Sequence, residues 1–354
     1  MSRGVPSSAG DGDTVQLPSR DELEAVARDV LDADTYAYYA SGAGDERSVH
    51  DNERAWREWY LRPRVLLDVR ALDTRTSVLG TSLSMPLLLA PCAFNGWAHP
   101  DGEAAVVRAA HRAGIVPIVS QSATLPFDEV ARASDGPIWF QCYPGADADV
   151  SDRVLAGVVG AGCRAIVVTA DAPVGGIRTR GMSRFAASAD AGAFTTGGNA
   201  SLWPGLDWAA VARIRRRIEV PVVVKGVLHP GDVERAVEHG VDAVIVSNHG
   251  GRQLEGVVPT AVALPGIVDA AADRIPVLVD GGVRDGRDVL RALALGAGAV
   301  AIGRPYLWAL AIGGEAGVLA LVERFRTELH NAMALTGQTS AAAVARDVVV
   351  TDRG

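Results

Sequence analysis

The stretch VIVSNHGGRQL, residues 244–254, joins a short apolar run to a dense group of polar residues and glycines. Val244–Val246 have the β-branched composition of a buried strand. The two glycines that follow allow sharp turns and a close approach of the backbone to a ligand. Such a strand delivers His249 and Arg252 to one place. A base beside a fixed cation suits a site that binds a carboxylate and removes a proton next to it.

Other short apolar runs of the same kind recur along the chain, and they predict parallel strands that are buried on both faces. With the run just quoted they are Met85–Ala90, Ile115–Val119, Ile138–Gln141, Ala165–Thr169, Pro221–Lys225, Ala243–Ser247, Pro276–Asp280 and Ala299–Gly303. Segments with helical spacing lie between most of them: Asp101–Ala113, Val150–Gly160, Trp208–Ile218, Gly231–His239, Thr260–Ala271 and Arg287–Leu295. Eight strands that alternate with helices predict an α/β fold of the (β/α)8, or TIM, barrel type. A doubly wound open sheet is the main competitor, and the strand count favours the closed barrel.

The rest of the chain is organised around this barrel. Residues 1–18 are small and polar and are expected to form a flexible arm. Residues 19–84 form an N-terminal helical cap, the barrel covers residues 85–335, and residues 336–354 form a C-terminal tail. A long loop after the fourth strand, residues 181–204, is rich in Gly, Ala, Ser and Thr and is expected to act as a lid. Within the cap, helices are expected at Asp21–Leu31 and Ala33–Ala40.

Composition narrows the class of protein. The chain has 354 residues, of which 48% are hydrophobic and 21% charged, as in globular proteins. A net charge of −8 argues against a nucleic-acid partner. The three cysteines form no CxxC pair, which favours a reducing, cytoplasmic setting and argues against a disulfide scaffold or a metal site. No run of 18 apolar residues occurs, so no membrane span is expected. The sequence thus favours an enzyme or binding protein for small molecules.

Polar side chains gather where the predicted strands end, and the carboxyl ends of barrel strands are where active sites form. The candidates in chain order are Pro91, Cys92, Ala93, Ser120, Ser122, Gln141, Tyr143, Thr169, Asp171, Arg178, Lys225, Ser247, His249, Arg252, Asp280, Gly281, Gly282, Arg284, Gly303 and Arg304. Each one alone has an ordinary structural explanation, such as a helix cap for Asp171 or a surface ion pair for Arg178. Lys225 is the exception. It is the only lysine in the chain, and a lysine that ends a buried strand needs an anion beside it.

The last two strand ends also predict a phosphate site. Paired glycines with Arg284, followed by Gly303 and Arg304, occupy the usual phosphate position of such barrels. No GxGxxG motif follows an early strand and no Walker-type lysine loop is present, which argues against a nicotinamide cofactor.

Eight segments, in order, resemble the FMN-dependent α-hydroxy acid oxidases and dehydrogenases, a family that includes glycolate oxidase, lactate oxidase and mandelate dehydrogenase. They are YYASGAGDE (38–46), RPRVLLDV (62–69), QCY (141–143), TADAP (169–173), VKGV (224–227), SNHGGRQL (247–254), DGGVRDGRDVLRALALGA (280–297) and IGRP (302–305). The resemblance covers about residues 20–345 and implies an FMN cofactor in the barrel.

The resemblance assigns roles to the residues that match the family's motifs. His249 becomes the active-site base, and Asp171 orients it and stabilises its protonated form. Tyr143 hydrogen-bonds the substrate hydroxyl. Lys225 lies against the N1/O2 edge of the flavin. The residues alone do not decide whether the substrate gives up a hydride directly or first loses its α-proton to His249.

Binding roles follow from the same resemblance. Arg178 and Arg252 hold the substrate carboxylate with the help of Tyr38, and Ser122 borders the substrate side chain. The cofactor is implied to contact Pro91, Cys92, Ala93, Ser120, Gln141, Thr169, Lys225 and Ser247 around the ring, and Asp280, Gly281, Gly282, Arg284, Gly303 and Arg304 at the ribityl phosphate.

The resemblance implies oxidation of an (S)-2-hydroxy acid to the 2-oxo acid, with dioxygen reduced to hydrogen peroxide. Glycolate oxidase has a tryptophan where this chain has Ser122, so we expect a larger, aromatic substrate, mandelate or 4-hydroxymandelate. Together with the Ala-, Gly- and Arg-rich composition, this points to hydroxymandelate oxidases as the nearest relatives. A lactate- or glycolate-type oxidase and a dehydrogenase that uses a quinone or another acceptor remain alternatives. An FMN-dependent isomerase, which has no use for the carboxylate site, is a further alternative. A non-catalytic flavin or carboxylate binder is another, although candidates for every catalytic role are present. The family also implies a homo-oligomer, a tetramer, and the polar loop 181–204 lacks a membrane-binding insert.

Overall fold

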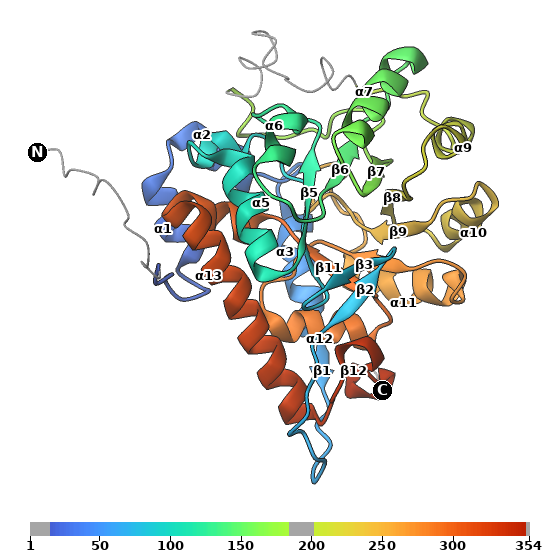
Figure 1. Ribbon diagram of the computed structural model, residues 1–354. Coiled ribbons are helices and arrows are strands. Elements are labelled where there is room, and N and C mark those ends of the chain that lie inside the picture. Colours follow the sequence, from blue (N-terminus) through green and yellow to red (C-terminus); the bar gives the residue numbers. More distant parts are fainter. Residues whose placement is uncertain (1–14, 184–201, 352–354) are drawn as a thin grey trace, which may run out of the picture.

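The computed structural model describes residues 15–183 and 202–351, and its centre is a closed barrel of eight parallel strands (Figure 1). The strands are β4 (Leu87–Leu89), β5 (Val116–Ser120), β6 (Trp139–Cys142), β7 (Ala165–Thr169), β8 (Val222–Val227), β9 (Ala243–Val246), β10 (Val277–Val279) and β11 (Ala299–Ile302). Neighbours in sequence are neighbours in space, and β11 pairs with β4 to close the ring. The predicted (β/α)8 barrel and all eight strand positions are confirmed.

Helices surround the barrel, one after each strand in most cases. They are α4 (Asn95–Ala98), α5 (Gly102–Ala113), α6 (Phe127–Arg132), α7 (Ala148–Gly160), α9 (Trp208–Arg217), α10 (Pro230–Glu238), α11 (Thr260–Ala271), α12 (Gly286–Ala294) and α13 (Arg304–Thr336). The predicted helices agree with these to within about two residues. The sequence did not predict α6, because six residues are too short to show a helical period.

Alternate residues of the strands point to two separate cores. Inside the barrel, side chains such as Leu88, Trp139 and Ile245 form one buried cluster. Outward residues join a larger cluster with the surrounding helices. Val78 and Leu83 belong to the inner cluster, and they come from the hairpin β2 (Thr76–Val78) and β3 (Thr81–Leu83) that leads into β4. This hairpin therefore covers the amino-terminal end of the barrel and leaves the opposite end for the site.

The N-terminal segment contains three helices, α1 (Leu23–Val30), α2 (Ala33–Ala40) and α3 (Arg47–Arg57). The sequence predicted α1 and α2 but not α3, whose buried face mixes Ser48 and Asn52 with Val49 and Trp56. Residues 15–18, which we expected to belong to a flexible arm, lie against the fold. Leu17 is buried, and its carbonyl accepts a hydrogen bond from Arg324 Nη2 at 3.1 Å. Residues 15–18 are therefore not part of a flexible arm, and residues 1–14 lie outside the described part of the chain.

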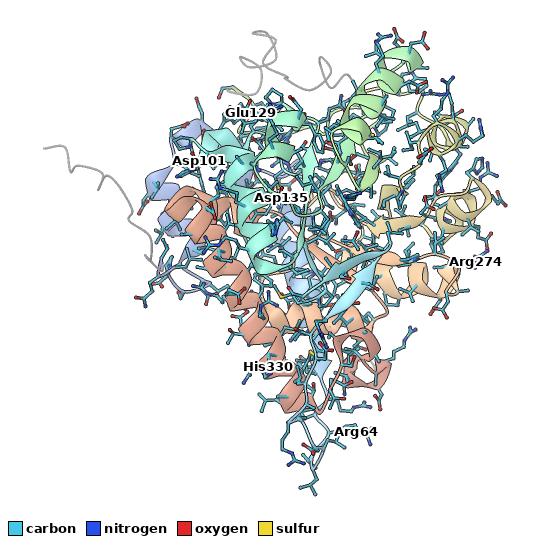
Figure 2. All side chains as sticks on the ribbon, viewed as in Figure 1. Arg64, Asp101, Glu129, Asp135, Arg274 and His330 are labelled. Atoms are coloured by element: carbon cyan, nitrogen blue, oxygen red, sulfur yellow. The ribbon has the colours of Figure 1, made fainter. Side chains whose placement is uncertain are left out.

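The C-terminal part is also docked rather than a free tail. After α13, the strand β12 (Val349–Thr351) pairs antiparallel with β1 (Trp59–Leu61), and two short 3-10 turns, Ala341–Ala343 and Arg346–Val348, precede it. Charged side chains cover the outside of the molecule, among them Arg64 on the loop after β1 and His330 on α13 (Figure 2).

Within the described residues, α13 alone is long and apolar enough to cross a membrane by length and composition. Two observations identify it as a core helix of the fold. Gly313 and Gly314 have non-helical backbone angles that break it in two, and 67% of its most apolar window is buried against the rest of the molecule. The predicted loop 181–204 lies outside the described residues except for its ends.

Candidate active site

A cavity opens at the carboxyl ends of the barrel strands and brings most of the predicted site residues together. It is lined by Tyr38, Tyr39, Ala90, Pro91, Cys92, Ala93, Ser120, Tyr143, Lys225, His249, Gly250, Arg252, Asp280, Gly281, Gly282, Val283, Arg284, Ala301, Ile302, Gly303, Arg304 and Leu307. Six predicted residues do not line it: Ser122, Gln141, Thr169, Asp171, Arg178 and Ser247. All six nevertheless contact or pair with a lining residue. Five do so through a hydrogen bond or a strand pairing, and Arg178 does so over the ring of Tyr38.

Lys225 lies near the carboxyl end of β8 and places a buried ammonium between two acceptors. Its Nζ lies 3.2 Å from Asp280 Oδ2 and donates to Ser247 Oγ at 2.8 Å. Burial alone would lower the pKa of Lys225, but the charges of Asp280 and Asp171 raise it above the ordinary value. Lysine therefore stays charged at the bottom of the cavity. The next position, 226, has to be glycine. Its φ is +110°, and a Cβ there would lie 2.5 Å from Cβ of Asp171.

His249 and Asp171 form a base and its orienting carboxylate. His249 Nδ1 lies 2.9 Å from Asp171 Oδ1, and the backbone N–H of His249 donates to Ser247 Oγ at 3.1 Å. Burial would raise the pKa of Asp171, but the charge and hydrogen bond of His249 bring it below the ordinary value. With Nδ1 held in this way, Nε2 is the ring nitrogen that can take the proton of a substrate hydroxyl, and the carboxylate stabilises the imidazolium that results.

Tyr143 stands beside this pair on the wall of the cavity. Burial, followed by the charge of Asp171, raises the pKa of Tyr143 well above the ordinary tyrosine value. The phenol therefore keeps its proton at neutral pH and can donate it in a hydrogen bond to a substrate oxygen.

Two arginines flank the ring of Tyr38. The guanidinium carbons of Arg252 and Arg178 lie 5.1 and 5.6 Å from its centroid. Arg252 Nη1 donates to the carbonyls of Tyr38 at 2.9 Å and Ser41 at 2.7 Å, at the carboxyl end of α2. This end of a helix favours cations. The helix thus fixes one nitrogen of Arg252 and leaves the rest of the guanidinium for a ligand.

Arg178 carries the clearest requirement for an anion. Its Nε and Nη1 are buried and have no hydrogen-bond partner among the described residues. Burial, and next the neighbouring charge of Arg252, lower the pKa of Arg178 to about 10. A carboxylate between the two guanidinium groups would satisfy the donors and remove the repulsion, because arginine's fork binds carboxylate in a bidentate manner.

Arg304 lies close to Arg252, at the same carboxyl end of α2. Its Nε, Nη1 and Nη2 donate to the carbonyls of Tyr39, Gly250 and Ser41 at 3.1, 3.0 and 3.0 Å. Burial and then the charges of Arg252 and Arg284 lower the pKa of Arg304 to about 9. Neutral carbonyls hold the side chain without cancelling its charge, which suits a phosphate ligand.

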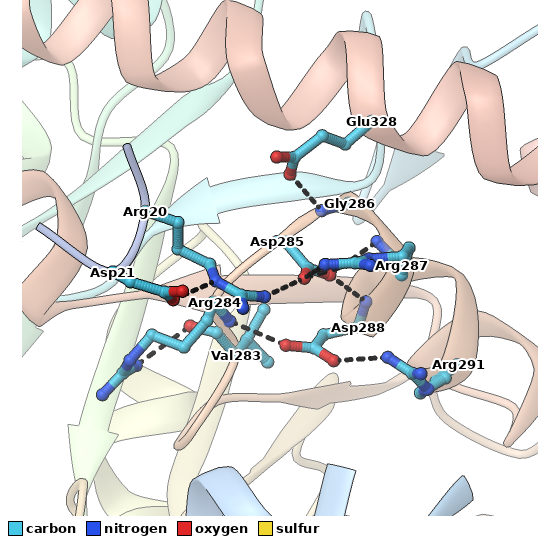
Figure 3. Close-up of polar contacts among 10 residues, drawn as sticks. All are labelled: Arg20, Asp21, Val283, Arg284, Asp285, Gly286, Arg287, Asp288, Arg291 and Glu328. Carbon is cyan, nitrogen blue, oxygen red and sulfur yellow. Dashed lines mark hydrogen bonds and ion pairs between the residues drawn. The ribbon is translucent and has the colours of Figure 1, made fainter. Parts of the chain in front are cut away.

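Carboxylates occupy the amino-terminal end of α12, directly after the Gly281–Gly282 turn (Figure 3). Asp285 accepts from the backbone N–H groups of Arg287 and Asp288, and Glu328 accepts from that of Gly286 at 3.0 Å. We therefore place the phosphate site on the glycine turn and the arginine side chains, and not on the end of α12. Arg284 is itself paired with Glu53 at 2.6 Å.

The donors and acceptors of the cavity fit FMN. Gln141 Nε2 and Asp280 Oδ1 are buried without a hydrogen-bond partner among the described residues, a donor for a flavin oxygen and an acceptor for a ribityl hydroxyl. Gly282, at φ +80°, leaves no room for a side chain, since a Cβ would lie 2.3 Å from the carbonyl oxygen of Asn52. Lys225 and Arg304 both place positive charge on the wall of the cavity. When bound, FMN supplies a two-electron acceptor that the side chains alone lack.

These features define a flavin-binding barrel with a carboxylate anchor and a histidine base. This combination of groups is suited to the oxidation of a 2-hydroxy acid. The chain belongs to the FMN-dependent dehydrogenase family, which it matches over residues 27–351. It is 38% identical to glycolate oxidase of Spinacia oleracea, over 96% of this chain and 97% of that one. It is 40% identical to L-lactate oxidase of a Nostoc species, over 89% and 93%. A solved mandelate oxidase bound to 3,3-difluoro-2-hydroxy-3-phenylpropionic acid has a TM-score of 0.88 and 39% identity, with 94% and 98% covered.

The protein is therefore an FMN-dependent 2-hydroxy acid oxidase. Different side chains of the cavity are suited to different parts of the reaction. From this geometry, Arg178 and Arg252 would bind and orient the substrate carboxylate, which would hold the α-carbon in one position. Tyr143 would donate to a substrate oxygen, and His249, oriented by Asp171, would remove a proton. Lys225 would place its positive charge beside the bound flavin.

Sequence reasoning missed a group of residues that support this site from behind. Asn52, Glu53 and Trp56 of α3 contact the loops after β9 and β10, and Asn248 and Tyr39 were given no role. Asn248 stood inside the quoted stretch beside His249, but its partner lies 196 residues earlier in the chain. No local pattern indicates a contact of that separation.

Proposed function

We propose that the substrate is an aromatic (S)-2-hydroxy acid, mandelate or 4-hydroxymandelate, which is oxidised to the 2-oxo acid while dioxygen is reduced to hydrogen peroxide. The observation that carries the proposal is the small residue Ser122 just after β5, beside a group of aromatic residues in the fold. The Ser122 carbonyl accepts from the N–H of Phe94 at 3.0 Å, and the rings of Phe94 and Tyr38 lie 5.8 Å apart. The ring of Tyr38 lines the cavity, and an aromatic substrate would gain from contact with it.

The similarity to solved mandelate oxidases supports the same substrate class. One of these structures contains benzoyl-formic acid, the 2-oxo acid that corresponds to mandelate. The similarity to glycolate and lactate oxidases supports the oxidation of a 2-hydroxy acid but gives no information on the size of its side chain.

Anaerobic stopped-flow measurements test the substrate. The rate of flavin bleaching is compared for glycolate, L-lactate, (S)-mandelate and (S)-4-hydroxymandelate. We expect the two aromatic acids to have the highest second-order rate constants. Ser122→Trp should lower their rate constants by about tenfold or more while glycolate is little affected. Faster reduction by glycolate than by either aromatic acid would refute the proposal.

Reoxidation tests the acceptor. The reduced enzyme is mixed with air-saturated buffer, and hydrogen peroxide is quantified with a coupled peroxidase. We expect one peroxide for each turnover. Slow reoxidation by dioxygen combined with rapid reoxidation by a quinone would identify a dehydrogenase instead.

We further propose, from the family resemblance and the composition, a cytoplasmic homotetramer. Light scattering coupled to size-exclusion chromatography of the holoenzyme tests the subunit number. A monomer at micromolar concentration would contradict it.

A further inference from the structure

The turn that carries the catalytic histidine has an unfavourable backbone conformation. His249, Gly250 and Gly251 all have positive φ, at +58°, +65° and +75°. Glycine adopts such values readily, but a histidine does so only where the surrounding structure holds it there. The question is which contacts hold His249, because its ring must meet Asp171 on one side and the substrate on the other.

A buried pair of amides lies directly before this turn. Asn52 Nδ2 donates to Asn248 Oδ1 at 2.8 Å, and Asn248 Nδ2 donates back to Asn52 Oδ1 at 2.8 Å. Asn52 is 1% exposed and Asn248 is 4% exposed, so water does not compete for these bonds. The two residues come from α3 and from the end of β9, and the pair fastens the N-terminal segment to the catalytic loop.

The remaining bonds of the two amides extend the attachment into the turn. Asn248 Oδ1 also accepts from the N–H of Gly251 at 3.2 Å, and Asn248 Nδ2 reaches the carbonyl of Val258 at 3.3 Å. Asn52 Oδ1 accepts from the N–H of Thr260 at 3.3 Å. One side chain of α3 therefore fixes both the start and the end of the loop that contains His249 and Arg252.

We propose that Asn52 is a positioning residue for the oxidation reaction. Its amide, paired with Asn248, holds residues 249–251 in the left-handed turn that directs His249 and Arg252 at the substrate. This role rests on the 2-hydroxy acid oxidase activity and is independent of whether the substrate is aromatic.

The cofactor loop is held by different contacts, which makes the role separable from FMN binding. Trp56 Nε1 and Thr260 Oγ1 both donate to the carbonyl of Gly281, at 2.8 and 3.1 Å. Loss of the Asn52 amide leaves these two bonds in place. The catalytic loop should therefore shift while the loop that binds the ribityl chain keeps its position.

The test compares Asn52→Ala with Ala55→Gly in the holoenzyme. Ala55 is buried on the same helix, and glycine there lowers helix stability without touching the catalytic loop. Three quantities are measured: the flavin reduction rate with the best hydroxy acid substrate, the dissociation constant of the matching 2-oxo acid from its effect on flavin absorbance, and the dissociation constant of FMN.

For Asn52→Ala we expect the reduction rate to fall and the 2-oxo acid to bind more weakly, each by about tenfold. FMN affinity should change by no more than about twofold. Ala55→Gly should lower the unfolding midpoint and leave all three quantities near wild type. Asn248→Ala should reproduce Asn52→Ala, and the double variant should be no worse than either single one, because both remove the same pair.

The proposal is overturned if Asn52→Ala changes only the unfolding midpoint, or if Ala55→Gly at a matched midpoint impairs reduction equally. Additive losses in the double variant would overturn it as well. Should Asn52→Ala fail to accumulate as a folded protein, Asn52→Ser, which keeps a small polar group on α3, is measured against the same criteria.

Discussion

Lys225 offers the most quantitative test of the site, because the only lysine of the chain lies in a buried ion pair. Its Nζ is 3.2 Å from Asp280 Oδ2, and the two side chains are 6% and 8% exposed. At an effective dielectric constant of about 20, two charges at this distance attract one another by about 5 kcal/mol. Replacing Lys225 by Met removes this attraction and leaves the carboxylate of Asp280 buried without a cation.

The carboxyl group can then avoid that state by taking up a proton. Protonating a group with the ordinary aspartate pKa of about 3.9 costs about 4 kcal/mol at pH 7 and about 1.5 kcal/mol at pH 5. The cost of protonation at pH 7, about 4 kcal/mol, is smaller than the lost attraction of about 5 kcal/mol. Protonation of the carboxyl group therefore limits the loss of stability. The folded variant binds a proton that the unfolded chain releases, so its deficit in stability must grow as the pH rises above about 4. We expect Lys225→Met to lose about 4 kcal/mol of unfolding free energy at pH 7 and about 1.5 kcal/mol at pH 5.

Urea unfolding of the holoenzyme at both pH values measures the effect. The dissociation constant of FMN is determined for each variant, so that its contribution to the apparent stability can be subtracted. The control is Lys225→Met with Asp280→Asn, which removes both charges. It should cost less than about 2 kcal/mol and show no difference between the two pH values. A single variant equally destabilised at pH 5 and pH 7, or a double variant as unstable as the single one, would refute the reasoning.

Three further substitutions test other parts of the site. Asp171→Asn should lower the flavin reduction rate by about 10³-fold while FMN stays bound. Because the pKa of Asp171 is lowered in the fold, its stabilisation is present above about pH 4 and is lost as the pH falls through the lowered value, so acid unfolding of this variant should be less steep. Arg178→Met should raise KM about 30-fold, the loss of about 2 kcal/mol from a charged hydrogen bond, and change kcat less. Gly282→Ala, whose Cβ would meet the carbonyl of Asn52 at 2.3 Å, should weaken FMN binding by more than about tenfold, as fluorescence titration would measure.

The barrel could be predicted because its strands carry their information locally. A run such as Ala165–Thr169 is completely buried and rich in valine and isoleucine, and nothing else in its surroundings has to be known. The helix α3 could not be predicted in this way. Its buried face includes Ser48 and Asn52 beside Val49 and Trp56, so polar residues interrupt the apolar stripe. Polar residues on that face make sense only once the loops of the active site lie against it.

The candidate site also contains residues that could be predicted from local sequence and residues that could not. Residues at strand ends, such as Lys225 and His249, could be located because the barrel fixes where strand ends meet. The pairing of Arg284 with Glu53 could not, since it joins positions 231 residues apart. Ser122 was expected to border the substrate, but it does not line the cavity, and its backbone N–H donates to Ser120 Oγ at 3.1 Å. An effect of Ser122 on substrate size would therefore be indirect.

The way in which the arginines are held explains how the site can bind two anions. Five cations surround the cavity, Lys225, Arg178, Arg252, Arg284 and Arg304, against three carboxylates, Asp171, Asp280 and Glu53. Arg252 and Arg304 meet the backbone carbonyls at the end of α2, which satisfy their donors but leave their charge intact. Had carboxylates filled that place, the cavity would lack the net positive charge that a phosphate and a substrate carboxylate both need. The N-terminal helices, which lie outside the barrel, thus determine the electrostatics of the site inside it.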